Sequence, residues 1–203
     1  MPKALVFDYD GVLADTERLH WKSWAEMLLP YDLRLTWEDY RRLWQGVSDA
    51  QLLALILKSA PHLPVEEFKQ QNLERRRKVC QWSLAESPIP AETIRLLASL
   101  SGYRIGLVTS SERADVEPVL RASGIYEKFD ALVFGCDAPV NKPAPDPYLL
   151  MAKKLGVSTG IAFEDSESGL ESAHAAGFKA VRIEQPQELA QVVARTLRDL
   201  AAL

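Results

Sequence analysis

The chain has 203 residues, of which 47% are hydrophobic and 26% charged, and its formal net charge at pH 7 is −4. This length and composition are typical of a globular protein with either one domain or a core that carries a smaller inserted domain. The small negative charge gives no electrostatic basis for binding nucleic acid or an anionic membrane. Cys80 and Cys136 have neither CxxC nor metal-ligand spacing, so we expect reduced thiols.

Signals for export or membrane insertion are not visible in the sequence. The basic residue near the N-terminus is not followed by the long apolar stretch of a signal peptide, and no run approaches the roughly eighteen apolar residues of a membrane span. We therefore expect a cytoplasmic protein with neither a membrane nor a nucleic acid as partner. The oligomeric state stays open, and a monomer is compatible with the sequence.

Five apolar runs predict the strands of a parallel sheet. The first, Ala4–Phe7, is continuous and ends at the acidic turn Asp8-Tyr9-Asp10-Gly11, as expected for a strand buried on both faces. The later runs are residues 104–108, 131–134, 160–163 and 180–183, and helical patterns separate them at 92–100, 114–123, 147–155 and 169–176. This alternation predicts an α/β fold with helices on both faces of the sheet and ligands at the carboxyl ends of the strands.

Residues 15–85 interrupt the alternation. Helical patterns at 17–29, 37–44, 49–58 and 65–82 have no strand-like run between them, and all five tryptophans lie here, at positions 21, 24, 37, 44 and 82. We interpret the segment as a small inserted α-helical domain whose tryptophans form its packed core, or its seam with the rest of the protein, rather than an aromatic ligand cage. The predicted domains are thus a core of residues 1–14 and 86–203 and a helical domain of residues 15–85.

Asp8 and Asp10 follow the first strand at a spacing that lets both side chains point to one side of a turn, because Gly11 permits the backbone to bend. One carboxylate could attack phosphorus while the other delivers a proton to the leaving oxygen. For an isolated pair of this kind, a solvated turn or a helix cap is the commoner explanation. The assignment of a nucleophile and an acid therefore depends on the other strand ends.

A second acidic pair, Glu164-Asp165, follows the strand at 160–163. Two acidic strand ends side by side would repel each other unless a cation lay between them, and Mg²⁺ prefers oxygen ligands. Asp8, the backbone carbonyl of Asp10, and Asp165 are the expected metal ligands. Glu164 is a further candidate ligand or a hydrogen-bond partner of the ligands. For this pair alone, surface acids that cap the next helix would be the simpler explanation.

Hydroxyl groups and a lysine complete the set. Thr109 and Ser110 follow the strand at 104–108, where hydroxyls and backbone N–H groups at a helix start bind phosphate oxygens, although both residues are also common helix caps. Lys142 has prolines on both sides, which would hold its ammonium group near a transferring phosphoryl group. A lysine in a proline-rich loop is otherwise usually solvated. The joint order of all these groups along the chain indicates phosphoryl transfer.

This ordered set resembles the four motifs of the haloacid-dehalogenase-like (HAD) superfamily over essentially the whole chain. The similar stretches are residues 7–17, 107–111, 142–146 and 164–169. The resemblance implies a Rossmann-like core, Mg²⁺ as cofactor, and an inserted helical cap of the subgroup that contains phosphoglycolate phosphatases and β-phosphoglucomutases. It also implies that Asp8 is phosphorylated, that Asp10 acts as acid and then as base, and that Thr109 and Lys142 hold the phosphate.

Dehalogenases of the superfamily use only the first aspartate and no metal, so the presence of Asp10 and Glu164-Asp165 argues against that activity. Mutase and phosphatase are harder to separate. His20, Trp24 and the Gly46-Val47-Ser48 loop resemble β-phosphoglucomutase-like proteins. However, Asp49 stands where those mutases carry an arginine that grips the distal phosphate of a bisphosphate, and an acid there would repel that phosphate.

Three further cap or substrate features are left open. His20 is a candidate hinge or proton-handling residue, or else makes a structural hydrogen bond. Arg113 differs from the corresponding mutase residue and is a candidate for contacting a substrate anion. The basic run at residues 75–78 is another such candidate, but we interpret it as a solvated helix face because charge runs on helices usually are.

We therefore predict a Mg²⁺-dependent phosphatase that hydrolyses a small phosphorylated metabolite through an aspartyl-phosphate intermediate. A β-phosphoglucomutase-like sugar-phosphate mutase is the alternative, and a non-catalytic binding protein on the same fold is a further one. The substrate stays open because side chains of the helical domain decide it.

Overall fold

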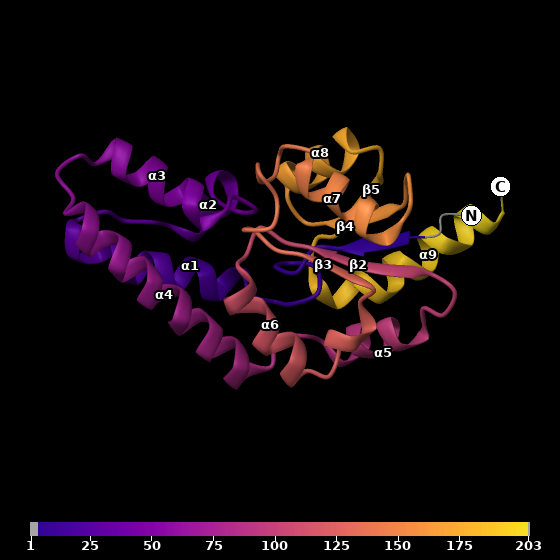
Figure 1. Ribbon diagram of the computed structural model, residues 1–203. Coiled ribbons are helices and arrows are strands. Elements are labelled where there is room, and N and C mark those ends of the chain that lie inside the picture. Colours follow the sequence, from indigo (N-terminus) through magenta and orange to yellow (C-terminus); the bar gives the residue numbers. More distant parts are fainter. Residues whose placement is uncertain (1–3, 203) are drawn as a thin grey trace.

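A computed structural model of the protein describes residues 4–202 (Figure 1). Its centre is a five-stranded parallel sheet with strand order β3-β2-β1-β4-β5. The strands are β1 (Ala4–Phe7), β2 (Arg104–Val108), β3 (Ala131–Val133), β4 (Ile161–Glu164) and β5 (Lys179–Arg182). In this order β1 pairs with β2 on one side and with β4 on the other, so that three of the predicted functional strand ends are neighbours.

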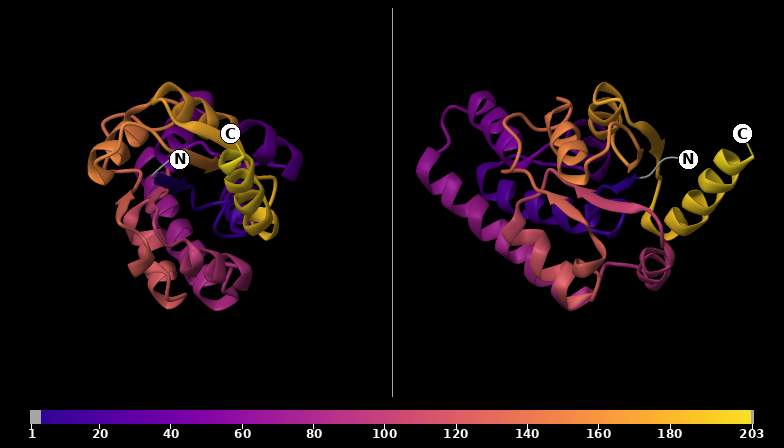
Figure 2. Two further views of the ribbon diagram at one scale, coloured as in Figure 1. Left: turned by 90° about the vertical axis from the view of Figure 1, so that its right-hand side faces the viewer. Right: turned by 45° about the vertical axis from the view of Figure 1, so that its right-hand side comes forward.

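Helices cover both faces of the sheet, as predicted. On one face lie α5 (Ala91–Ser99), α6 (Arg113–Ala122) and α9 (Leu189–Ala201), and on the other lie α7 (Asp146–Leu155) and α8 (Glu167–Ala175) (Figures 1 and 2). Short 3₁₀ turns occur at Leu29–Tyr31, Tyr126–Lys128 and Pro186–Glu188. Side chains of β1 alternate between the two faces: Leu5 and Phe7 pack with the first helix group, whereas Ala4 and Val6 pack with the second. The predicted α/β, Rossmann-like fold is confirmed.

Between β1 and α5 the chain forms four helices with no strand among them, at one end of the sheet (Figure 1). They are α1 (Glu17–Leu28), α2 (Trp37–Leu43), α3 (Asp49–Ser59) and α4 (Val65–Glu86). We call them the helical segment. Two of its helices start at side-chain caps: at the start of α2 Thr36 accepts a hydrogen bond from the Asp39 backbone, and at the start of α3 Ser48 forms a capping box with Gln51.

The helical segment has a hydrophobic cluster of its own. Trp24 and Phe68 are fully buried in it, and Trp24 meets Trp44 edge to face with ring centroids 5.4 Å apart. Trp21 and Trp37 pack against the same cluster, whereas the Trp82 ring is covered by the Lys22 and Lys78 ammonium groups. The tryptophans are therefore mostly core residues, as the sequence indicated.

The basic run on α4 corrects one interpretation. Arg75 is not on a solvated face, because only 4% of it is exposed. Its guanidinium group lies 4.1 Å from the centre of the Trp24 ring and donates hydrogen bonds to Asn72, Ser23 and Asp49. The charge run gave no sign of this burial, since two of the three acceptors, Ser23 and Asp49, come from α1 and α3, which are distant in sequence.

The end of one helix also differs slightly from the expectation. The helix predicted at 65–82 continues to Glu86 and ends at Ser87, whose φ of 50° is left-handed. Within the described part of the chain, no helix is both long enough and apolar enough to cross a membrane.

Candidate active site

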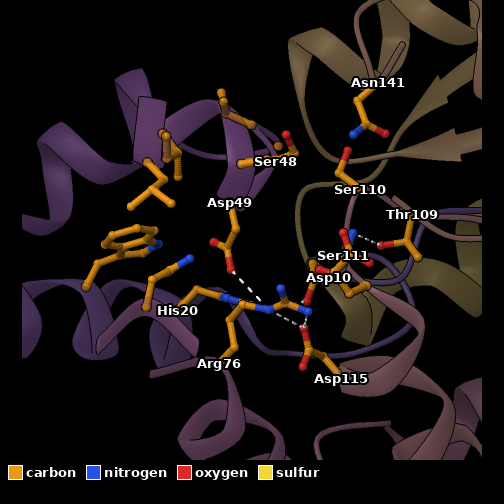
Figure 3. Close-up of a pocket in the computed structure, with 18 of the residues that line it drawn as sticks. Asp10, His20, Ser48, Asp49, Arg76, Thr109, Ser110, Ser111, Asp115 and Asn141 are labelled. Atoms are coloured by element: carbon orange, nitrogen blue, oxygen red, sulfur yellow. Dashed lines mark hydrogen bonds and ion pairs between the residues drawn. The ribbon is translucent and has the colours of Figure 1, made fainter. Parts of the chain in front are cut away.

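The predicted functional residues meet at the carboxyl ends of β1, β2 and β4. A cavity of about 290 Å³ lies between this edge of the sheet and the helical segment. Asp8, Asp10, Thr109, Ser110 and Asp165 line it from the sheet side. Figure 3 shows how Asp10 and the hydroxyl residues face His20, Asp49 and Arg76 across this space. The topology explains the meeting, because adjacent parallel strands end at the same edge.

Asp8 is 5% exposed and sits opposite the Lys142 ammonium group. Lys142 Nζ lies 3.1 Å from Asp8 Oδ1 and 2.7 Å from Glu164 Oε1, and it donates to the Val108 carbonyl oxygen at 3.1 Å. Burial, followed by the charge of Glu164, raises the pKa of Asp8 well above its usual value. Burial alone would lower the pKa of Lys142, but the two carboxylates raise it, so that Lys142 is ammonium at neutral pH.

Glu164 lies deeper than Asp8 and is fully buried. Its Oε1 atom accepts hydrogen bonds from Lys142 and from the Tyr148 hydroxyl of α7. Its Oε2 atom has no hydrogen-bond partner among the described residues. The backbone of Gly169 packs against this carboxylate so closely that a Cβ atom there would collide with it. Glu164 is thus a buried carboxylate with one oxygen that neither Lys142 nor Tyr148 satisfies.

Asp165 reaches the cavity beside the turn that follows β1. Its Oδ2 atom accepts a hydrogen bond of 2.6 Å from Gln45 of the helical segment. Gly11, with φ of 70°, lies so close to the same carboxylate that a Cβ atom would collide with it. Burial raises the pKa of Asp165 well above its usual value, and the charge of Glu17 adds to the effect.

The acidic residues fit a divalent cation. One carboxylate oxygen from each of Asp8, Glu164 and Asp165 lies within 4.8 Å of the others. Burial, followed by the charges of neighbouring carboxylates, raises the pKa values of Asp8 and Asp165, and the single ammonium group of Lys142 pairs with Asp8 and Glu164. An all-oxygen set of this kind suits Mg²⁺, which commonly keeps waters and phosphate oxygens as its remaining ligands.

Asp10 stands apart from this acidic group and is surrounded by donors. Its Oδ1 atom accepts hydrogen bonds from Thr16 at 2.5 Å and lies 3.1 Å from His20 Nε2, while its Oδ2 atom accepts from Ser111 at 2.7 Å. Burial alone would raise the pKa of Asp10, but His20 and the hydroxyl donors lower it. The neighbouring Asp10 charge in turn overcomes burial and raises the pKa of His20 to about 9. The two residues form a charged pair at neutral pH.

The hydroxyl residues after β2 behave in two ways. Thr109 Oγ1 accepts a hydrogen bond of 3.0 Å from the Ser111 backbone N–H, which shapes the turn. The Ser110 hydroxyl lines the cavity and is buried with no partner among the described residues. A buried hydroxyl without a partner is costly, and a bound phosphate oxygen would satisfy it.

Arg113 is not brought to the cavity lining. It projects from α6 toward Glu117 and Asp137, 3.4 and 3.3 Å from its guanidinium nitrogens, and lies over the Phe134 ring. Four residues that hydrogen-bond the predicted functional carboxylates had no role predicted from the sequence: Thr16, Gln45, Ser111 and Tyr148. Thr16 and Ser111 stand inside the recognised motifs, which was a usable signal, whereas Gln45 and Tyr148 had none.

Known proteins with similar sequences and folds agree with this geometry. The family model of haloacid dehalogenase-like hydrolases matches residues 2–177. A phosphorylated carbohydrates phosphatase from Thermotoga maritima is 31% identical over 182 residues, which cover 88% of this chain and 83% of that protein. The β-phosphoglucomutase of Bacillus subtilis is 30% identical over 209 residues, covering 98% and 91%. CbbY from Rhodobacter sphaeroides, solved in complex with phosphate, has a TM-score of 0.74 at 29% identity, covering 89% and 85%.

These similarities cover most of the chain and agree with the arrangement of the strand ends. The chain is therefore an enzyme of the haloacid dehalogenase-like hydrolase family. The proteins to which it is similar include both a phosphatase and a mutase, so family membership alone leaves the fate of the phosphoryl group open.

Proposed function

We propose that the protein is a Mg²⁺-dependent phosphatase of a small phosphorylated carbohydrate or related metabolite, with Asp8 as nucleophile. The observation that carries the proposal is the juxtaposition of Asp8 with Lys142 on one side and with Asp165 on the other. A carboxylate so placed can attack phosphorus while cationic groups offset charge on the phosphoryl oxygens. The names of the similar proteins support a phosphorylated carbohydrate as the substrate class.

In the proposed reaction, Asp8 Oδ attacks phosphorus and the bond from phosphorus to the leaving oxygen breaks. At neutral pH the proton of the Asp10–His20 pair resides on His20, and Asp10 receives it from His20 and passes it to the leaving oxygen. Asp10 then takes a proton from a water molecule, which attacks the phosphorus of the aspartyl-phosphate and releases inorganic phosphate and free Asp8. Ser110 and Thr109 are the proposed contacts of the phosphate oxygens.

The proposed Mg²⁺ ligands are Asp8, Asp165 and the Asp10 backbone carbonyl, with Glu164 as a direct ligand or a support for the others. When bound, Mg²⁺ would neutralise charge on the phosphoryl oxygens and lower the repulsion between them and the carboxylates. The proposed domain division places residues 15–85 as a cap over the core. Contacts from Gln45 to Asp165 and from Ser168 to the Gly46 carbonyl support closure that excludes water.

The test is phosphate release from a panel of phosphate esters that includes phosphoglycolate, hexose and pentose phosphates and nucleotides, with Mg²⁺ and with a chelator. We expect Mg²⁺-dependent release from at least one carbohydrate phosphate, and loss of turnover with a preserved fold in Asp8→Asn. Substantial metal-dependent turnover by Asp8→Asn would refute the role of Asp8. Failure on the whole panel would favour the non-catalytic alternative.

The similarity to a β-phosphoglucomutase keeps a sugar-phosphate mutase as a second candidate. In that case the phosphoryl group on Asp8 would return to a bound sugar rather than pass to water. Incubation with β-glucose 1-phosphate and a bisphosphate primer separates the two: glucose 6-phosphate without phosphate release identifies a mutase, and phosphate release identifies a phosphatase.

A further inference from the structure

The cavity carries an excess of acidic groups away from the sheet. Four acidic side chains that line it in the described part of the chain lie beyond the strand ends, against three basic ones: the acids are Glu17, Asp49, Glu112 and Asp115, and the bases are His20, Lys69 and Arg76. His20 is paired with Asp10, and Lys69 is half-exposed and pairs with Glu66 at 2.8 Å. Arg76 is therefore the cationic group best placed to meet the body of a bound substrate.

Arg76 extends from α4 into the space between Asp49 of α3 and Asp115 of α6, as Figure 3 shows. Its Nε and Nη2 atoms lie 2.8 and 2.7 Å from Asp115 Oδ2, and its Nε lies 3.8 Å from Asp49 Oδ2. We call these three residues the Arg76 bridge. About a fifth of each of their side chains is exposed, so the ion pairs are only partly screened by water.

Arg75 also pairs with Asp49, so the formal charges of the bridge and Arg75 sum to zero. Two arginines thus face two aspartates, and no cationic charge is left over for a second phosphate group. The ion pairs engage Oδ2 of Asp49 and Oδ2 of Asp115, which leaves the Oδ1 atoms as acceptors for hydroxyl donors. Polar groups of this kind suit an uncharged polyhydroxyl body better than an anionic one.

We propose that the Arg76 bridge selects substrates with one phosphate and an uncharged, hydroxyl-bearing body, and rejects bisphosphates. The inference rests on the proposed function, because it concerns the body of the ester whose phosphate meets Asp8. A second phosphate would have to displace an aspartate from Arg76 or lie beside two carboxylates. Both arrangements are unfavourable, because like charges a few ångströms apart in a partly desolvated site repel strongly.

The test compares kcat/KM for a hexose 6-phosphate with kcat/KM for the corresponding hexose 1,6-bisphosphate. Wild type, Asp49→Asn and Asp115→Asn are measured with saturating Mg²⁺. We expect wild type to prefer the monophosphate, and each variant to shift the ratio of the two kcat/KM values about tenfold or more toward the bisphosphate, because one repelling charge is removed and Arg76 is partly released.

Glu112→Gln is the matched control, since it removes a carboxylate that lines the same cavity and is outside the bridge. Its ratio should change less than about threefold, because its charge does not hold Arg76. Thermal unfolding of all variants separates selectivity from damage to the fold. Any of three outcomes would overturn this inference but not the proposed function. They are equal shifts of the ratio in the control and the bridge variants, an unchanged ratio in the bridge variants, and a wild-type preference for the bisphosphate. Wild type that releases no phosphate from any monophosphate would overturn the proposed function and this inference with it.

Discussion

Removal of the buried ammonium group of Lys142 should strongly destabilise the fold. In Lys142→Met the apolar stem is kept, but Asp8 and Glu164 lose the cation that lies 3.1 and 2.7 Å from them. Breaking a buried ion pair by deleting one partner typically costs about 3–5 kcal/mol, because the remaining charge is buried without compensation. Two carboxylates are left here, but one can take up a proton, so we expect about 4 kcal/mol at pH 8 in the absence of divalent cations.

Two dependences make this prediction specific. The loss in free energy of unfolding should shrink as the pH falls toward 5, because the Asp8 carboxylate, whose pKa burial already raises, takes up a proton in the folded variant. It should also shrink when Mg²⁺ is added, because a bound cation would replace part of the missing charge. A fold stabilised mainly by packing at this position would show neither dependence.

The measurement is urea unfolding followed by circular dichroism, in buffer with a chelator and in buffer with Mg²⁺. Lys78→Met serves as control, because the Lys78 ammonium group pairs with Glu26 at the exposed surface, where such a pair contributes about 1 kcal/mol or less. A loss below about 1 kcal/mol for Lys142→Met with chelator present would refute the view that Lys142 holds two buried charges together.

Two further predictions concern Asp10 and Ser110. The pKa of His20, raised to about 9 beside Asp10, means that the pair stabilises the fold fully below about pH 6.5, the unfolded value, and loses this contribution as the pH rises through 9. The difference in free energy of unfolding between wild type and His20→Gln, at most about 3 kcal/mol, should therefore decline between pH 6.5 and 9.5 when it is measured by urea titration. A difference that stays constant over this range would contradict the charged pair. Ser110→Ala removes a buried hydroxyl without a partner, so it should leave the fold equally stable or more stable by up to about 1 kcal/mol while KM rises. Loss of stability with unchanged KM would show that the hydroxyl serves the fold and not the phosphate.

The sequence was sufficient for most of the fold. Continuous apolar runs such as Ala4–Phe7 predicted buried parallel strands, and β1 and β2 were found at the expected residues. The polar residues after these strands predicted the position of the site, because parallel strands end at one edge. Local patterns carry this information, since each strand end and helix cap is encoded within a few residues.

Contacts between distant segments could not be read in the same way. Gln45 meets Asp165 across 120 positions of the chain, and the burial of Arg75 depends on Trp24 and Asp49, which are contributed by other helices. The Arg76 bridge joins the helical segment to α6 for the same reason. These contacts arise from the way the helical segment packs on the core, and a helix taken alone gives no indication of which of its charged residues will be covered.

The role of Asp8 is tested most directly by acid-quenched turnover with a good substrate from the panel, followed by mass spectrometry of the peptide that contains Asp8. The account predicts that this peptide gains the mass of one phosphoryl group in wild type during turnover, and that the gain is absent in Asp8→Asn. The role of Asp8 would be contradicted if wild type released phosphate with no phosphorylated peptide detectable at any quench time. It would also be contradicted if the added mass were found on another residue.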